Sequence, residues 1–366
     1  MTVPAGRVIH TNNFDLLRLL AASQVMYLHA VHHLRPESNG VLTVLTWLSQ
    51  FFPGVPVFFF MSGFLISWSL RRNKDLISYA RNRVLRIYPA LWVCFLVSIL
   101  VVAATGYWAA VPVSGRSFMA WVVAQVTVAQ FFNPDFLRGF GVGVLNGSLW
   151  TITVELQFYV LLPLIFWGIG RISQRRQLVV LLALILVGLF AEYVLVSSTQ
   201  TNPESMLVKL FGVTVIPYLH MFLIGALVQV HFERVRPYVE GKALVWVVLY
   251  VVGALVMARM TGGPAGAVHM NLVVLVLLYG TVISAAYSWR TLSTRILGKN
   301  DVSYGTYIYH MVFVNLLVAM GWTGRVSGVV VAVVATFAVA WVSWVWVEQP
   351  ALALKRVGAR PTGVRP

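Results

Sequence analysis

The sequence predicts an all-α polytopic membrane protein, and three observations support this fold class. Of the 366 residues, 59% are hydrophobic and 10% are charged, whereas a soluble domain carries about 25% charged residues. Ten apolar runs each reach about 20 residues, the length that crosses roughly 30 Å of hydrocarbon. The 13 tryptophans and 14 tyrosines suit side chains at membrane–water interfaces. We therefore expect about ten transmembrane helices.

The predicted spans follow one another through the whole chain with short connections. One further apolar stretch, 118–132, has only about 15 residues and contains Gln125 and Gln130. We expect it to lie on or re-enter the outer membrane face without crossing. The ten spans are residues 14–33, 51–70, 82–104, 148–169, 177–197, 208–230, 243–261, 270–288, 303–321 and 326–348.

The distribution of basic residues predicts the orientation of these spans. If residues 118–132 do not cross, 20 of the 27 Lys and Arg residues fall on one side of the membrane. If the stretch crossed, 13 of those 20 would move to the outside. Because cytoplasmic loops are enriched in Lys and Arg, we expect ten spans with both termini in the cytoplasm. Residues 1–350 then form a transmembrane domain and 351–366 a basic cytoplasmic tail attracted to anionic lipid.

The net charge of +16 does not predict a nucleic-acid partner, because the basic residues occur in short clusters between apolar runs. The single cysteine, Cys94, excludes an internal disulfide framework and a Cys-rich metal site. His32 and His33 lie close to His29, but no carboxylate or cysteine cluster accompanies them. We therefore expect no bound metal, and a role for these two histidines at the outer rim.

The first predicted span contains two polar residues that are costly inside a membrane. Arg18 and His29 are 11 residues apart, which is about three helical turns and roughly 16 Å of rise. Both side chains project from one face of one helix, at different depths. Each residue therefore needs a partner or a function.

The predicted depths make Glu155 a partner for His29. His29 lies roughly 8 Å below the outer boundary, and Glu155, in the fourth span, about 10 Å below it. A carboxylate raises the basicity of an imidazole and selects its tautomer, as a general base requires. The alternative is a buried pair that only joins two helices. His220 and His310, near mid-membrane, are more typical of core or cavity-lining histidines.

Arg83 and Arg86 form a second candidate site. Their spacing of i, i+3 places them on one helix face at the cytoplasmic end of the third span. Guanidinium groups bind phosphate through two parallel hydrogen bonds. Ordinary anchoring by snorkelling side chains is equally consistent with the spacing.

Five motifs, in order and correctly spaced, resemble those of the acyltransferase-3 family of integral-membrane O-acyltransferases. The resemblance covers nearly the whole chain. Two features depart from the family pattern: Leu16-Leu17 stand where a glycine usually precedes the arginine, and no SGNH-type esterase domain follows the last span. The motifs are FDLLRLLAASQVMYLHA with Arg18 and His29, FFPGVPVFFFMSGFLIS with Ser62 and Gly63, RNRVLRIYPAL with Arg83 and Arg86, NGSLWTITVELQFYVLLPL with Ser148, Trp150, Glu155, Tyr159 and Pro163, and SYGTYIYH with Ser303, Tyr304, Tyr307 and His310.

The resemblance implies transfer of an acyl group, usually acetyl, from cytoplasmic acyl-CoA to a hydroxyl on a sugar of a surface or exported glycan. It also implies a multi-pass protein of the bacterial inner membrane. The implied partners are acyl-CoA, a glycan or lipid-linked glycan, and membrane lipid. The acceptor stays open among lipopolysaccharide O-antigen, exopolysaccharide, peptidoglycan, a macrolide and a glycolipid.

The resemblance also suggests roles for the candidate residues. Arg83 and Arg86 would hold the CoA phosphates, with Arg18 lining the donor channel. His29, oriented by Glu155, would take the proton of the acceptor hydroxyl. Direct transfer is more economical than an acyl-histidine intermediate. The expected pocket residues are Ser62, a candidate donor to the oxyanion, and Ser148, Trp150, Tyr159, Tyr304 and His310.

Three other functions compete with acyl transfer. A proton-coupled transporter or flippase of lipid-linked saccharide would use His29 and Glu155 as a proton relay, but it predicts internal repeats, which the sequence lacks. A structural membrane protein would use its buried charges only to specify helix pairing. A glycosyltransferase would need a metal-binding or outward carboxylate site. Turnover of acyl-CoA by purified protein separates the acyltransferase from the first two.

Overall fold

The computed structural model describes residues 12–37, 40–72, 75–261 and 271–357, and every regular element within these ranges is a helix. Six helical stretches of the described chain are long and apolar enough to cross a membrane. Two shorter apolar helices, Ile216–Val230 and Leu272–Tyr287, accompany them. The all-α, multi-pass class is therefore confirmed. The six stretches are Gly40–Arg72, Leu76–Ala104, Gly147–Ile169, Gln174–Thr201, Ala243–Met260 and Val326–Lys355.

Each predicted span overlaps at least one helix. The principal helices are α1 (Phe14–Leu34), α3 (Gly54–Arg72), α4 (Leu76–Ala104), α7 (Trp150–Ile169), α8 (Gln174–Thr201), α10 (Leu219–Val230), α12 (Ala243–Thr261), α13 (Leu272–Tyr287), α15 (Ser303–Ala319) and α16 (Val326–Ser343). The shorter ones are α2 (Gly40–Gln50), α5 (Tyr107–Ala110), α6 (Gly115–Val126), η1 (Asp135–Leu137), η2 (Gly147–Leu149), α9 (Met206–Phe211), η3 (Ile216–Tyr218), α11 (Phe232–Val239), α14 (Leu292–Leu297), η4 (Trp344–Glu348) and α17 (Gln349–Val357).

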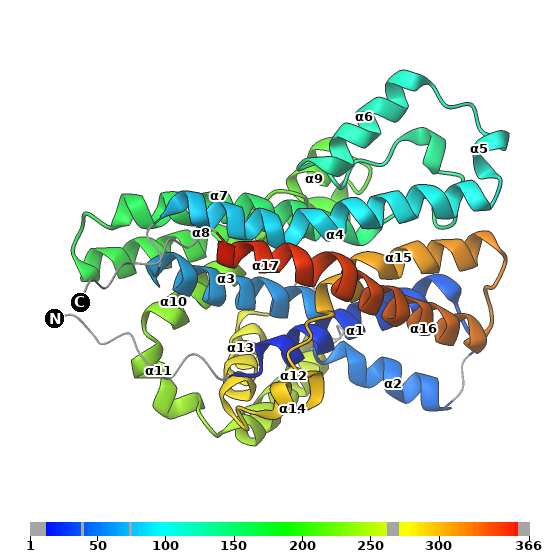
Figure 1. Cartoon of the computed structure of the whole chain (residues 1–366). Coiled ribbons are helices and arrows are strands. Elements are labelled where there is room, and N and C mark those ends of the chain that lie inside the picture. The colour runs from blue at the N-terminus through cyan, green and yellow to red at the C-terminus, as the bar shows by residue number, and fades with distance from the viewer. Residues whose placement is uncertain (1–11, 38–39, 73–74, 262–270, 358–366) are drawn as a thin grey trace.

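The long helices α4, α7, α8, α15 and α16 run along one common direction, and α12 to α14 lie against one side of the bundle (Figure 1). The last residues of α3, the first residues of α4 and the connection from α7 to α8 lie at one end of the bundle. The connection from α15 to α16 lies at the opposite end. In the core, α1 packs against α3 and α15, and α3 packs against α10.

The stretch predicted to be interfacial corresponds to α6, which stands away from the bundle (Figure 1). Its 12 residues rise about 18 Å, too little to cross roughly 30 Å of hydrocarbon. Trp121 of α6 is buried against Phe95 of α4, with ring centroids 4.8 Å apart. The helix is therefore fastened to the extension of α4 beyond the bundle.

Helix α4 begins six residues before the predicted span, because Asp75 caps its first turn. The Asp75 carboxylate accepts hydrogen bonds from the backbone N–H groups of Ile77 and Ser78, both at 3.1 Å. A hydrogen bond from the Ser78 hydroxyl, together with these two, lowers the pKa of Asp75. Arg83 and Arg86 consequently lie ~10 and ~15 Å into the helix. Both arginines line the cavity described below, so they lie inside the bundle and not in the first turn of the helix.

Two other predicted spans are not single α-helices. The sixth is divided into α9, η3 and α10, since Pro217 in η3 cannot donate a ladder hydrogen bond. The tenth passes through a π-helical turn, η4, into α17. Helix α17 extends through Val357, so the first residues of the predicted tail are helical. Residues 358–366 of that tail and the N-terminal residues 1–11 lie outside the described residues.

Helices α3 and α10 approach each other through two glycines. A Cβ atom on Gly63 of α3 would overlap the backbone carbonyl of Phe222, and one on Gly225 of α10 would overlap the carbonyl of Phe60. Membrane helices that pack through small residues bring their backbones unusually close. The glycine of the SGFLI motif is therefore a packing residue. It holds the neighbouring Ser62 at the position described below.

We predict that Gly63→Ala destabilises the protein, because the added methyl group must separate α3 from α10. The expected loss is about 1–3 kcal/mol in the free energy of unfolding, measured as a lower Tm of the purified protein in detergent. Gly168→Ala in α7 is the matched control, since no heavy atom lies within 4 Å of its Cβ position. Equal Tm values for the two variants would contradict the packing role of Gly63.

Candidate active site

A buried cavity of about 110 Å³ lies between α1, α3, α4, α7 and α15. Its walls combine apolar side chains with a small number of polar groups, as is typical of ligand sites. The structure thus brings together residues from motifs far apart in the sequence. Seven of the predicted site residues line it: Arg18, Ser62, Arg83, Arg86, Glu155, Tyr159 and Tyr304.

The carboxylate of Asp301 joins two of the three cavity arginines. Arg18 Nη1 lies 3.4 Å from Asp301 Oδ2 and 2.8 Å from Asp15 Oδ1, and Arg86 Nη2 binds the same Asp301 oxygen. The backbone N–H of Ser303 donates to Asp301 Oδ1 at 3.3 Å. The Asp301 side chain is only 10% exposed, so the arginines provide the charge compensation that a buried carboxylate needs. Asp301 was not predicted, although an isolated acidic residue two positions before the SYGTYIYH motif could have indicated it.

Arg83 differs from the other two arginines because no carboxylate of the described chain lies within salt-bridge distance of it. Its guanidinium lies between two aromatic rings, 5.9 Å from the centroid of Tyr79 and 5.6 Å from that of Tyr159. Its Nε atom is buried and has no hydrogen-bond partner among the described residues. Buried donors are rarely left unpaired. The guanidinium of Arg83 is therefore available to an anion.

Glu155 binds two hydroxyl groups of the cavity wall. Ser62 Oγ and the Tyr159 hydroxyl both donate to Glu155 Oε1 at 2.7 Å. No hydrogen bond joins Glu155 to His29 in the described chain, so the expected pairing is corrected. The physical reason is the direction of each side chain: Glu155 points with Tyr159, one turn further along α7, into the cavity, whereas His29 faces α15. Because Ser62 already donates to Glu155, its hydroxyl hydrogen is not free for an oxyanion.

His29 is paired instead with His310. His29 Nδ1 lies 2.8 Å from His310 Nε2, and the rings are stacked with centroids 5.1 Å apart. His310 is fully buried, and its Nδ1 lies 2.6 Å from the carbonyl oxygen of Tyr307. The sequence indicated both histidines but not their contact.

The hydrogen bonds of this pair select its tautomers. A carbonyl oxygen only accepts, so His310 Nδ1 must carry the hydrogen. The Nε2 atom of neutral His310 then accepts a hydrogen bond from Nδ1–H of His29. In the neutral pair, Nε2 of His29 therefore has a free lone pair. This is the state that a general base requires.

Tyr307 connects the histidine pair to the cavity. Its ring lines the cavity, and its hydroxyl shares a 2.7 Å hydrogen bond with Thr151 Oγ1. His310 follows one turn later on α15. The cavity and the histidine pair are therefore neighbours along α15 and form one site. The distance along α1 from Arg18 to His29 is roughly 16 Å.

Three predicted pocket residues do not line the cavity: His310, which is paired with His29, and Ser148 and Trp150 at the start of α7. Ser148 is buried and donates to Asn146 Oδ1 at 2.8 Å. Trp150 packs against Tyr218, with ring centroids 5.2 Å apart. Both residues support the start of α7. Among the described residues, no group of three or more His, Cys, Asp or Glu side chains is arranged to hold a metal.

Comparisons with known proteins agree with these motifs. A family model described as an acyltransferase domain matches residues 11–345. Nodulation protein 10 of Rhizobium leguminosarum bv. viciae is 34% identical over 366 residues, covering 94% of each chain. An O-acetyl transferase of Shigella phage Sf6 is 24% identical over 343 residues, 93% of this chain and 95% of its own. O-acetyltransferase OatA of Staphylococcus aureus (strain NCTC 8325 / PS 47) is 29% identical over 154 residues, 39% of this chain and 25% of its own. No solved structure matches the chain significantly.

We predict that Asp301→Asn strongly destabilises the protein, because it leaves Arg18 and Arg86 without their shared carboxylate. Removing one partner of a buried ion pair costs about 3–5 kcal/mol, which thermal unfolding in detergent would measure. Asp135→Asn is the control, since the Asp135 side chain in its pair with Arg138 is 99% exposed and exposed pairs contribute about 0–1 kcal/mol. Similar losses in both variants would contradict a special role for Asp301.

Proposed function

Because the chain belongs to the acyltransferase-3 family of membrane O-acyltransferases, we propose that it transfers an acyl group, expected to be acetyl, from cytoplasmic acyl-CoA to a hydroxyl of a sugar in a surface or exported glycan. The observation that carries this proposal is the arrangement of two groups, the candidate donor-binding arginine and the candidate base. Arg83, without a carboxylate partner among the described residues, lines the cavity. An imidazole with a free lone pair, that of His29, lies about three helical turns along α1 from the cavity residue Arg18.

The proposed orientation is ten spans in the bacterial inner membrane with both termini in the cytoplasm. The end of α3, which carries Arg71 and Arg72, and the start of α8, which carries Arg175 and Arg176, lie at the same end of the bundle (Figure 1). The positive-inside rule makes this end cytoplasmic. Arg83 and Arg86 then lie towards the cytoplasm, and His29 lies towards the outer face.

The donor would enter from the cytoplasmic end. Its phosphates would bind Arg83 through two parallel hydrogen bonds, with Arg86 and Arg18 adding positive charge. The thin pantetheine arm would follow the cavity past Glu155 to Tyr307. This path would place the thioester near His29.

The reaction would be a direct acyl transfer. Nε2 of His29 accepts the proton of the acceptor hydroxyl while that oxygen forms a bond to the thioester carbonyl carbon. The tetrahedral intermediate then collapses, the carbon–sulfur bond breaks, and the proton passes from His29 to the sulfur of CoA. His310 acts as the positioning residue in this scheme, in place of Glu155, because it holds His29 in the required tautomer.

The acceptor would approach from the outer face, where a lipid-linked glycan presents its sugar hydroxyls. Such a route keeps the acceptor and the nucleotide on opposite sides of the protein. Only the acyl group then passes from the donor on one side to the acceptor on the other.

We predict that His29→Gln abolishes transfer while folding and CoA binding are retained. Loss of a general base lowers the rate by about 10²–10⁴-fold, measured as incorporation of labelled acetyl from acetyl-CoA into the glycan fraction. His32→Gln, an exposed change on the same helix, serves as the control and should leave the rate unchanged. Full activity in His29→Gln would remove the assignment of His29 as the base.

We also predict that Arg83→Gln raises the KM for acetyl-CoA about tenfold or more, with little change in kcat, because a charge-assisted phosphate contact is lost. Arg83→Lys should recover only part of the affinity, since an ammonium cannot bind phosphate through a planar fork. Arg138→Gln, at an exposed position, provides the control. An unchanged KM in Arg83→Gln would refute the phosphate contact.

A further inference from the structure

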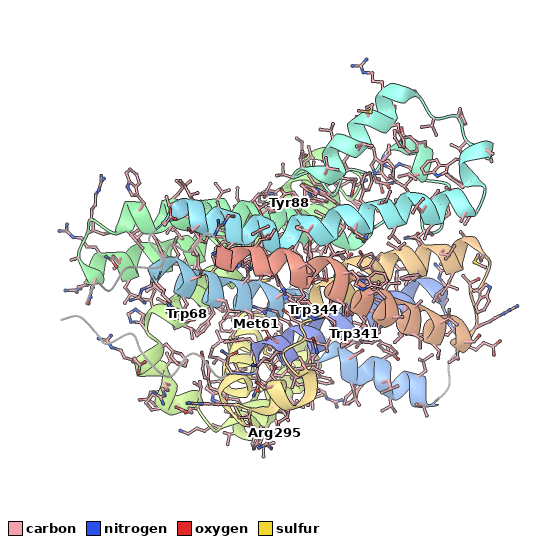
Figure 2. All side chains as sticks on the ribbon, in the orientation of Figure 1. Met61, Trp68, Tyr88, Arg295, Trp341 and Trp344 are labelled. Carbon is pink, nitrogen blue, oxygen red and sulfur yellow. The ribbon has the colours of Figure 1, made fainter. Side chains whose placement is uncertain are left out.

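The C-terminal helix α17 forms part of the surroundings of the cavity arginines. It lies alongside α4 (Figure 1), and the Arg81 guanidinium donates to the carbonyl oxygen of Lys355 at 3.3 Å. The π-helical turn η4 begins at Trp344, which is labelled in Figure 2, and leads into α17. Trp344 Nε1 donates to Asn300 Oδ1 at 3.0 Å, next to Asp301. The segment formed by η4 and α17 therefore contacts α4 and the loop before α15, whose Asp301 binds Arg18 and Arg86.

Lys355 adds a fourth positive charge to this region. Its half-buried ammonium is close enough to Arg83, Arg86 and Arg18 for each guanidinium to repel it. No carboxylate of the described chain lies within salt-bridge distance of the Lys355 ammonium. Arg83 likewise has no carboxylate partner, as described above.

Such a group of cations is unfavourable without an anion, because like charges in a partly buried region repel with little screening. Asp15 and Asp301 compensate Arg18 and Arg86 only. The carboxyl group of Glu348 also interacts with Arg86. Arg83 and Lys355, on the neighbouring helices α4 and α17, have no carboxylate of the described chain within salt-bridge distance. A ligand with several phosphates would satisfy both at once.

We propose that Lys355 binds a phosphate of the nucleotide donor, so that α17 completes the donor site that the proposed function requires. This inference rests on the proposed use of acyl-CoA. It assigns to the C-terminal helix a role in donor specificity, favouring the phosphorylated nucleotide over a bare pantetheine thiol. A phosphate of an anionic lipid headgroup has the same chemistry, so the experiment must separate the two sources.

The test compares the Kd of CoA with that of pantetheine, which carries no phosphate. The full-length protein is placed in vesicles of phosphatidylcholine alone, so that no anionic lipid is present. Lys355→Gln should weaken CoA binding about tenfold and leave pantetheine binding unchanged. Lys355→Arg should keep most of the CoA affinity. Lys242→Gln, at another lysine expected on the cytoplasmic side, should change neither value.

The outcomes separate this inference from the proposed function. If the wild type binds CoA more tightly than pantetheine but Lys355→Gln does not alter the CoA affinity, the role of Lys355 is refuted and the proposed donor stands. Equal weakening for CoA and pantetheine would also refute a phosphate contact. An effect of Lys355→Gln that arises only when anionic lipid is added would assign the residue to the membrane surface and overturn the inference. A wild type that does not bind CoA would overturn the proposed donor and this inference together.

Discussion

One buried carboxylate holds the site together. Asp301 contacts Arg18 of α1 and Arg86 of α4, and it lies directly before α15. Asp301 thereby joins the three helices that carry the site at one point inside the bundle. Each arginine would otherwise be an uncompensated charge in a region where desolvation is expensive. Two guanidinium groups share this carboxylate, and Arg83, the third arginine of the cavity, has no carboxylate of the described chain within salt-bridge distance.

From this point the candidate functional groups follow one another along α1 and α15. Helix α1 leads from Arg18 to His29, and α15 leads from Tyr304 and Tyr307 to His310. The two helices pack against each other, so the histidines meet as a consequence of the same packing. The contact between the proposed base, His29, and its proposed positioning residue, His310, therefore depends on the relative register of α1 and α15.

Much of this arrangement could be predicted from the sequence, because apolar length and intramembrane charges are strong local signals. Arg18, Arg83, Arg86 and Glu155 were all identified as site residues from their cost in a membrane or their motif. The partners could not be predicted, since a rise of 1.5 Å per residue gives depth but not the direction in which a helix face points. Glu155 and His29 have similar depths yet face different helices. Asp301 and the helical start of the tail were missed for another reason: a loop carboxylate and a short basic helix carry no apolar periodicity.

The contact between Asp15 and Arg18 within α1 bears on how the protein is made. Asp301 is translated 283 residues after Arg18, so the first helix enters the translocon long before its distant partner exists. An arginine alone would oppose insertion, whereas the aspartate one turn earlier supplies an opposite charge on the same segment. The nascent helix thus brings its own counter-ion, and assembly with the C-terminal part of the chain adds Asp301 as a second one.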